Sequence, residues 1–182
     1  GIKHDLVRGE SFYNDRMKPV EEELQLKGLL EESDGAMIVR LGEDMAPCLI
    51  RKADGASLYA TRDLASALYR MNELKAYLNL YVVGVDQTLH FRQVFKVLEL
   101  MGYSWVNKLH HIAFGMYRFK DAKLSTRKGN TIFLEDVFAR AIDLVQEVIA
   151  KKNPDLPDAA KVARQVGIGA VVFNDLVNDR VK

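Results

Sequence analysis

The sequence predicts an α/β protein: part of a parallel sheet with flanking helices, a small antiparallel element near residues 36–60, and a helical segment at the C-terminal end. Two observations indicate this fold class. Short apolar runs rich in β-branched residues, at 80–85 and 109–114, are separated by a stretch with helical periodicity. A helical crossover is the connection that parallel pairing of two strands requires. We therefore expect the two runs to pair in parallel, with ligands bound at their carboxyl ends.

Composition restricts the possible functions. A chain of 182 residues suffices for one domain with a core, or for one large domain and part of another. Because the net charge is only +1, contact with nucleic acid has to be local. The single cysteine, Cys48, allows neither an internal disulfide nor a cysteine metal cluster, which predicts a reducing, cytoplasmic location. The sequence has no apolar run of about 18 residues and no signal-peptide pattern, so it predicts neither a membrane span nor export.

The first part of the chain is predicted to lead into a helix. Residues 1–7 read as a strand or extended segment. Asn14 can cap a helix whose apolar stripe ends at Gly28. The chain has no initiator Met, from which we expect the sequence to begin within a domain.

A small antiparallel element is predicted next. Residues 36–41 and 48–52 suit short strands. Asp54-Gly55 is the dipeptide of a tight hairpin turn, and it leads into a further strand predicted at 57–60. Thr61 can then cap the helix that follows.

Apolar residues recur at helical spacing in four further segments. These are 61–74, about 90–101, 134–152 and about 158–179. The prolines Pro154 and Pro157 separate the last two. The final helix is apolar on more than one side, so we expect it to pack against a partner larger than itself.

A basic loop at 123–130, Lys-Leu-Ser-Thr-Arg-Lys-Gly-Asn, combines three cations with two hydroxyls. Lys and Arg supply donors suited to phosphate oxygens, and Gly129 lets the backbone turn or approach a ligand closely. The loop therefore favours an anion, although a solvated basic turn would contain the same residues.

A second candidate is the turn Gly84-Val85-Asp86-Gln87, where a strand is expected to end and a helix to begin. Gly84 allows close approach, and Asp86 can accept hydrogen bonds from paired ribose hydroxyls. An ordinary turn with an Asp cap is the alternative. His90 and Gln93 are three residues apart, so they share one face of the following helix, where a His is also an ordinary surface residue.

A third candidate is Tyr59-Ala60-Thr61-Arg62-Asp63, which places a phenol and a carboxylate at another junction into a helix. Asp63 in a first helical turn would be favoured by the helix dipole whatever the function. If the ligand is a cation, bidentate geometry selects a guanidinium over an ammonium. Glu10 is a candidate second carboxylate, or a plain surface residue.

The three motifs occur in the order Tyr59–Asp63, Gly84–Phe91 and Lys123–Asn130, with Gly9–Tyr13 before them and Val166–Ala170 after them. The ordered set covers nearly the whole chain and resembles the catalytic domain of arginyl-tRNA synthetase. The resemblance implies a class I enzyme built on a Rossmann-like, nucleotide-binding parallel sheet. Such an enzyme joins arginine to ATP as arginyl-adenylate and then esterifies the terminal ribose of tRNA(Arg). It further implies ATP with Mg²⁺ as ligands, arginine and tRNA(Arg) as partners, no membrane, and no homo-oligomer.

The basic loop resembles the KMSKS signature of class I synthetases. Lys123 and Ser125 match its first and third positions, whereas Leu124 replaces the usual Met and Thr126 replaces the second Lys. The loop would stabilise charge on the α- and β-phosphates as pyrophosphate leaves. The implied catalytic residues are Lys123, Ser125, Arg127 and Lys128, the last two being alternatives for the second cation.

The resemblance also implies roles for the other candidates. Asp86 is the implied ribose contact, and Gln87 a contact to the ammonium or carboxylate of arginine. Tyr59 and Asp63 are the implied pocket for the guanidinium, with Glu10 opposite. The implied ATP-binding residues are Gly84, Asp86, His90, Gln93, Met116 and Lys123.

One part of the family pattern is missing from these residues. The first class I signature, a His-x-Gly-His-type motif, does not occur, and neither does an anticodon-binding domain. We therefore expect a truncated piece that is inactive alone. Residues 1–152 would be the carboxyl-terminal portion of the catalytic domain, and 153–182 a helical segment leading toward the anticodon-binding domain. A non-catalytic nucleotide-binding module is the alternative.

Overall fold

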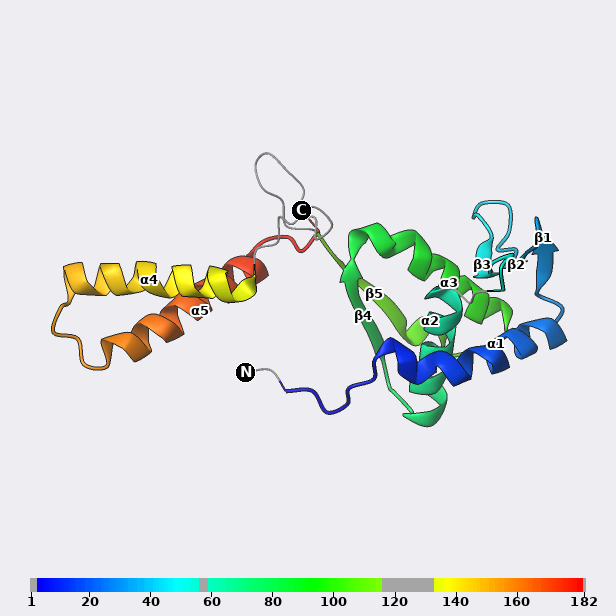
Figure 1. The fold of residues 1–182 in the computed structure, drawn as a ribbon, viewed down its shortest axis with the longest axis horizontal. Coiled ribbons are helices and arrows are strands. Elements are labelled where there is room, and N and C mark those ends of the chain that lie inside the picture. The colour runs from blue at the N-terminus through cyan, green and yellow to red at the C-terminus, as the bar shows by residue number, and fades with distance from the viewer. Residues whose placement is uncertain (1–2, 56–58, 116–132, 182) are drawn as a thin grey trace. The chain divides into compact units, whose positions relative to one another are not determined.

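The computed structural model of the chain describes residues 3–55, 59–115 and 133–181. The chain forms two compact units, Gly1–Ala113 and Phe114–Lys182, which we name unit 1 and unit 2. Unit 1 contains both sheets, apart from the last residue of β5, and the helices α1 to α3, and unit 2 contains a helical hairpin (Figure 1). The predicted α/β fold class is confirmed.

The parallel sheet of unit 1 consists of β4 (Asn79–Gly84) and β5 (Leu109–Phe114). Between them in sequence lies α3 (Thr88–Leu100), which supplies the crossover that parallel pairing requires. The two predicted strands and the predicted helix between them are therefore confirmed, with small shifts at their ends.

The antiparallel sheet consists of β1 (Glu31–Ser33), β2 (Ala36–Val39) and β3 (Cys48–Arg51), in that order. Asp34 and Gly35 join β1 to β2 with φ angles of 50° and 75°. Two successive residues with positive φ form a tight hairpin turn, for which Asp-Gly is a preferred dipeptide. The predicted strands β2 and β3 are confirmed, whereas β1 and its turn were not predicted.

The segment after β3 corrects two predictions, because α2 (Tyr59–Leu68) begins earlier than expected. Tyr59 and Ala60 are helical, so the strand predicted at 57–60 is wrong for them, and the other two positions lie outside the described residues. Thr61 lies inside the helix and is fully buried, so it is not a cap. Its Oγ1 donates a 2.6 Å hydrogen bond to the carbonyl of Ile50, which fastens α2 to β3.

The N-terminal helix, α1 (Asn14–Leu26), also differs in how it begins. A 3-10 turn, Glu10–Tyr13, continues directly into it, and Asn14 is already helical. The predicted Asn14 cap is therefore wrong. The strand alternative for 1–7 is wrong for the part that the structure describes, because 3–7 lie outside any strand.

The core of unit 1 lies between α1, α2, α3 and the two sheets. Helix α2 continues into a π-turn, Tyr69–Glu73, which ends the predicted stripe before Leu74, a residue that is 43% exposed. The largest fully buried side chains are Leu24, Ile50, Leu64, Leu98, Val20, Val39, Val94, Val97, Thr61 and Cys48.

Unit 2 contains α4 (Leu134–Lys152) and α5 (Ala159–Val177), which lie side by side as a hairpin (Figure 1). Both predicted helices are confirmed. Ala163 and Gly167 of α5 are buried in this hairpin. The predicted boundary between 152 and 153 stays a prediction. In the ranges that the structure describes, every helix is too short or too polar to cross a membrane.

Candidate functional site

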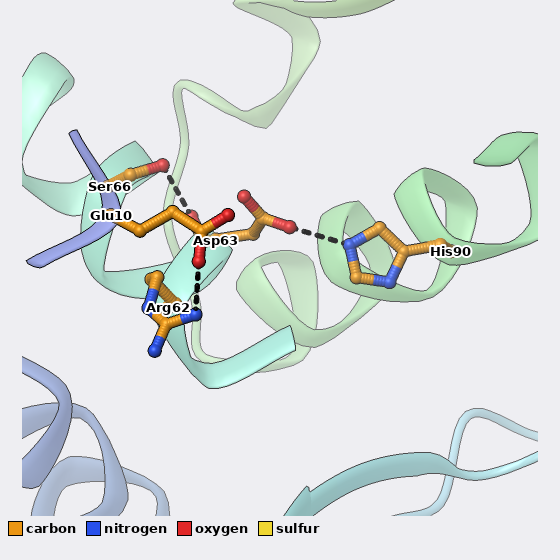
Figure 2. A network of polar contacts seen from close by, with 5 residues as sticks. All are labelled: Glu10, Arg62, Asp63, Ser66 and His90. Carbon is orange, nitrogen blue, oxygen red and sulfur yellow. Dashed lines mark hydrogen bonds and ion pairs between the residues drawn. The ribbon is translucent and has the colours of Figure 1, made fainter. Parts of the chain in front are cut away.

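Polar residues from three parts of unit 1 form a network around α2. They are Glu10 in the 3-10 turn before α1, Arg62, Asp63 and Ser66 in α2, and His90 in α3 (Figure 2). Figure 2 shows that Arg62 and Asp63, although adjacent in sequence, reach toward different partners. The second turn of α2 therefore positions the candidate site.

Asp63 forms a close pair with His90. Nε2 of His90 lies 2.6 Å from Oδ2 of Asp63. Because an ionised carboxylate can only accept hydrogen bonds, Nε2 of His90 is the donor. The side chain of His90 is 23% exposed and that of Asp63 is 33% exposed, so water still reaches the carboxylate. The pair fixes the orientation of the carboxylate and leaves it accessible to a ligand.

The position of Asp63 in α2 corrects a further prediction. Because α2 begins at Tyr59, Asp63 lies in the second turn of the helix, and the first turn carries no acidic residue. The field of the helix dipole acts mainly within the first turn. The dipole therefore does not account for a carboxylate at this position, whereas the contact with His90 does.

Arg62 forms the second pair of the network. Its Nη1 donates a 2.7 Å hydrogen bond to Oε2 of Glu10. Arg62 is 24% exposed and Glu10 is 71% exposed, so the ion pair contributes little, on the order of 0–1 kcal/mol. Among the described residues, the buried Nε of Arg62 has no hydrogen-bond partner. Glu10 thus already contacts a guanidinium, one that belongs to the chain itself.

Aromatic rings support His90 from the core side. The Phe91 ring, which is 5% exposed, lies edge to face with His90 at a centroid distance of 5.2 Å. It also contacts Tyr81 at 4.9 Å and His111 at 4.8 Å. Burial raises the pKa of Tyr81 to about 12, with the positive charge of Arg70 opposing the shift and the negative charge of Asp63 adding to it. The site therefore rests on a layer of packed aromatic rings.

The predicted strand-to-helix junction is confirmed. β4 ends at Gly84, and a 3-10 turn, Val85–Gln87, leads into α3. The side chains of Asp86 and Gln87 are exposed there, and Nε2 of Gln87 donates to Oδ2 of Asp86 over a long 3.5 Å. These groups lie at the carboxyl end of a parallel strand, which is where ligands bind in open α/β sheets.

Two other predicted residues lie apart from the network. Nε2 of Gln93 donates to the carbonyls of Ala46 and Pro47, at 2.9 and 3.2 Å, so Gln93 holds the loop before β3. Tyr59 is the first residue of α2 and is 69% exposed. The structure assigns neither of them a contact with Asp63.

The described residues thus bring together Glu10, Asp63 and His90 from the predicted site. The predicted residues Met116, Lys123, Ser125, Arg127 and Lys128 lie outside the described residues. Sequence reasoning missed Arg62 and Ser66. The Oγ of Ser66 donates a 3.1 Å hydrogen bond to the backbone carbonyl of Asp63. An opposite charge directly beside a candidate carboxylate was the available signal for Arg62.

No group of three or more His, Cys, Asp or Glu side chains that could hold a metal ion occurs in residues 3–55, 59–115 and 133–181. A magnesium ion that binds with a nucleotide keeps several waters and takes most of its other ligands from the phosphates.

Comparison with known proteins identifies the family. A family model described as "tRNA synthetases class I (R), catalytic domain" matches residues 2–182. The arginine–tRNA ligase of Lactobacillus johnsonii is 54% identical over 181 residues, which are 100% of this chain and 32% of that protein. The arginine–tRNA ligase of Halothermothrix orenii is 52% identical over 183 residues, with the same two shares. The chain therefore spans about a third of the length of these relatives.

Solved structures agree on the fold. The arginyl-tRNA synthetase of Plasmodium falciparum aligns with a TM-score of 0.82 and 22% identity, over 100% of this chain and 31% of that one. The Thermus thermophilus arginyl-tRNA synthetase aligns with a TM-score of 0.76 and 20% identity, over 92% of this chain and 35% of that one. With the family match over nearly every residue, the chain belongs to the arginyl-tRNA synthetase family of class I tRNA synthetases, as part of the catalytic domain.

Proposed function

We propose that this chain is part of an arginine–tRNA ligase and contributes its arginine pocket and part of its ATP site. In the reaction, a carboxylate oxygen of arginine attacks the α-phosphorus of ATP. The bond to pyrophosphate breaks, and arginyl-adenylate forms. A ribose hydroxyl at the end of tRNA(Arg) then attacks the arginyl carbonyl, and AMP leaves. The observation that carries the proposal is the half-buried Asp63 carboxylate, held by His90 within the motif that resembles the family.

The arginine side chain is proposed to bind at Asp63. A planar guanidinium donates two parallel hydrogen bonds to a carboxylate, which an ammonium cannot reproduce. Tyr59 borders this pocket in the proposal, and Glu10 lies opposite, where its present partner is the guanidinium of Arg62. Gln87 would contact the ammonium or carboxylate end of the substrate. Discrimination against lysine would follow, because a site that leaves a half-buried carboxylate unpaired rejects the wrong substrate.

ATP is proposed to bind at the carboxyl end of β4. Asp86 would accept hydrogen bonds from the ribose hydroxyls, and Gly84 would let the backbone approach the nucleotide. Gln93 and Met116 complete the proposed border; the resemblance places His90 there as well, but Nε2 of His90 is bound to Asp63. Mg²⁺ would enter with ATP and neutralise phosphate charge when bound.

The basic loop is proposed to act on the leaving pyrophosphate. Lys123 and Ser125 would donate to phosphate oxygens, and Arg127 or Lys128 would supply the second cation. Positive charge placed where negative charge develops lowers the barrier, because the interaction is strongest in the transition state. This assignment stays a proposal that rests on the resemblance of the loop to the family signature.

The test uses the full-length enzyme that contains this chain, in steady-state aminoacylation of tRNA(Arg). We expect Asp63→Asn to raise the KM for arginine and to lower kcat/KM, because the neutral amide loses the charge-assisted pair. The KM for ATP should stay nearly unchanged. As the matched variant, Lys123→Ala should mainly lower kcat with little change in the KM for arginine. An unchanged arginine KM in Asp63→Asn would remove Asp63 from the pocket, and ATP binding without any arginylation would favour a non-catalytic nucleotide-binding module.

A further inference from the structure

His90 reaches from the first turn of α3 to the second turn of α2, across 27 residues of sequence. The contact joins its Nε2 to the carboxylate that the proposed function assigns to arginine. The predicted role of His90 was at the nucleotide, and the ring has only two nitrogens. Because Nε2 is bound to Asp63, only Nδ1 is left for a nucleotide. The geometry therefore points to a role for His90 in binding arginine.

The contact with His90 leaves the carboxylate of Asp63 able to accept further hydrogen bonds. Among the residues that the structure describes, Oδ1 of Asp63 has no hydrogen-bond partner, and Figure 2 shows it directed away from His90. Each carboxylate oxygen has two lone-pair sites, so Oδ2 can accept a second donor beside Nε2 of His90. A guanidinium fork can therefore bind both oxygens while the bond to His90 remains.

The ring of His90 is itself held in place. It packs edge to face on Phe91, with an interplanar angle of 78°, and only 23% of the His90 side chain is exposed. Phe91 is in turn fixed by Tyr81, Phe95 and His111, whose rings lie 4.8 to 5.9 Å from its own. A donor held this firmly restricts rotation of the Asp63 carboxylate before any ligand arrives. Restricting the free protein in its bound geometry strengthens binding, because less freedom is lost when the ligand binds.

We propose that His90 is a positioning residue for arginine recognition, which holds the Asp63 carboxylate in the orientation that receives the guanidinium. The inference rests on the proposed function, because it takes Asp63 as the partner of arginine. His90 acts through Asp63 and does not itself touch the guanidinium. It therefore determines how well arginine binds, and it has little effect on the chemical step once arginine is bound.

The experiment compares variants of His90 in the full-length enzyme. His90→Leu removes the donor, and we expect the KM for arginine to rise about tenfold, because the Asp63 carboxylate regains freedom that arginine binding must then remove. His90→Gln places an amide N–H close to the position of Nε2 and should restore most of the arginine affinity. His90→Asn places its amide too far from Asp63 and should behave like His90→Leu. The KM for ATP and kcat should change little in all three variants.

Lys96→Leu is the matched control. Lys96 lies on the same helix, and its 3.1 Å ion pair with Glu99 is exposed and has no contact with the site. Removing it should leave the KM for arginine unchanged. If His90→Leu does not fold, the contrast between His90→Gln and His90→Asn carries the test, because both are polar and differ mainly in reach.

A double-mutant cycle separates the proposed arginine pocket at Asp63 from the positioning role of His90. In an Asp63→Asn background, His90→Leu should raise the arginine KM no further, because the carboxylate that His90 orients is already gone. If Asp63→Asn alone leaves the arginine KM unchanged, the proposed pocket fails and the positioning role fails with it. If Asp63→Asn raises that KM while His90→Leu instead raises the KM for ATP, the pocket stands, the positioning role is overturned, and His90 is a nucleotide contact.

Discussion

At the scale of single residues, burial determines the chemistry of Cys48. The residue lies in β3 and is 2% exposed. Loss of water around the thiol raises its pKa from 9.0 to about 12. The thiolate, and not the thiol, is the nucleophile and metal ligand. Cys48 is therefore a small apolar core residue with no reactive form at neutral pH.

We expect iodoacetamide to leave Cys48 unmodified in the folded chain near neutral pH and to alkylate it in concentrated urea, with mass spectrometry detecting the adduct. Equal alkylation rates in the folded and unfolded chain would contradict the buried position.

The same pKa shift predicts how stability depends on pH. Because the folded thiol stays neutral to a higher pH than the unfolded one, the contribution of the buried thiol to the free energy of unfolding is fully present below pH 9.0. It is lost as the pH rises toward about 12.

The candidate site was predictable as a set of residues but not as a geometry. Asp63 and His90 each stand near the start of a helix that follows a strand or turn, and this pattern made them candidates. Their contact depends on how α2 packs against α3, and no local pattern encodes packing between segments 27 residues apart. For the same reason Arg62 was missed, because its bond to Glu10 joins residues 52 apart.

At the scale of elements, periodicity predicted the segments that have a strong pattern of their own. α4, β4 and β5 were placed closely because apolar spacing and the breaking residues at their ends agree. β1 was missed because Glu31-Glu32-Ser33 has little strand propensity, and only pairing with β2 makes it a strand. The turn signal was also ambiguous, since Asp-Gly occurs at 34–35, where it joins β1 to β2, and again at 54–55.

Gly167 determines how closely α5 can approach α4. A Cβ added at Gly167 would lie 2.9 Å from both Cα and N of Ile142, which are backbone atoms of α4. Atoms this close cannot coexist without moving the helices apart. We expect Gly167→Ala to destabilise the hairpin by about 1–3 kcal/mol, although alanine is the better helix former. Hydrogen exchange measured on peptides from α4 and α5 reports this effect within unit 2.

Gly169 provides the control, because it lies in the same helix and, among the described residues outside its own turn of helix, no heavy atom lies within 4 Å of an added Cβ. Gly169→Ala should slow hydrogen exchange in α5, since alanine gains up to about 1 kcal/mol over glycine within a helix. Faster exchange in both variants, or in neither, would show that close packing at Gly167 does not limit the hairpin.

At the scale of the whole molecule, the parallel sheet of unit 1 has one buried and one exposed face. Tyr81 of β4 is 6% exposed, whereas its neighbours Leu80 and Val82 are 50% and 66% exposed. Apolar side chains side by side on one face of a sheet are typical of a surface that another segment covers. Since the chain spans about a third of the length of its relatives, we expect the remainder of the full-length enzyme to cover this face.

Two isosteric substitutions test this expectation. In the 182-residue chain alone, Val82→Thr should change the free energy of unfolding by less than about 0.5 kcal/mol, because the added hydroxyl is in water. Val97→Thr, at a residue that is 0% exposed, should cost about 1–3 kcal/mol, because its hydroxyl enters the core. In the full-length enzyme the cost of Val82→Thr should rise toward that of Val97→Thr, while the cost of Val97→Thr stays the same. Urea unfolding of both variants in both contexts gives the comparison. A cost for Val82→Thr that is equally small in the full-length enzyme would mean that this face of the sheet remains in water, and that the apolar side chains of β4 have no covering segment.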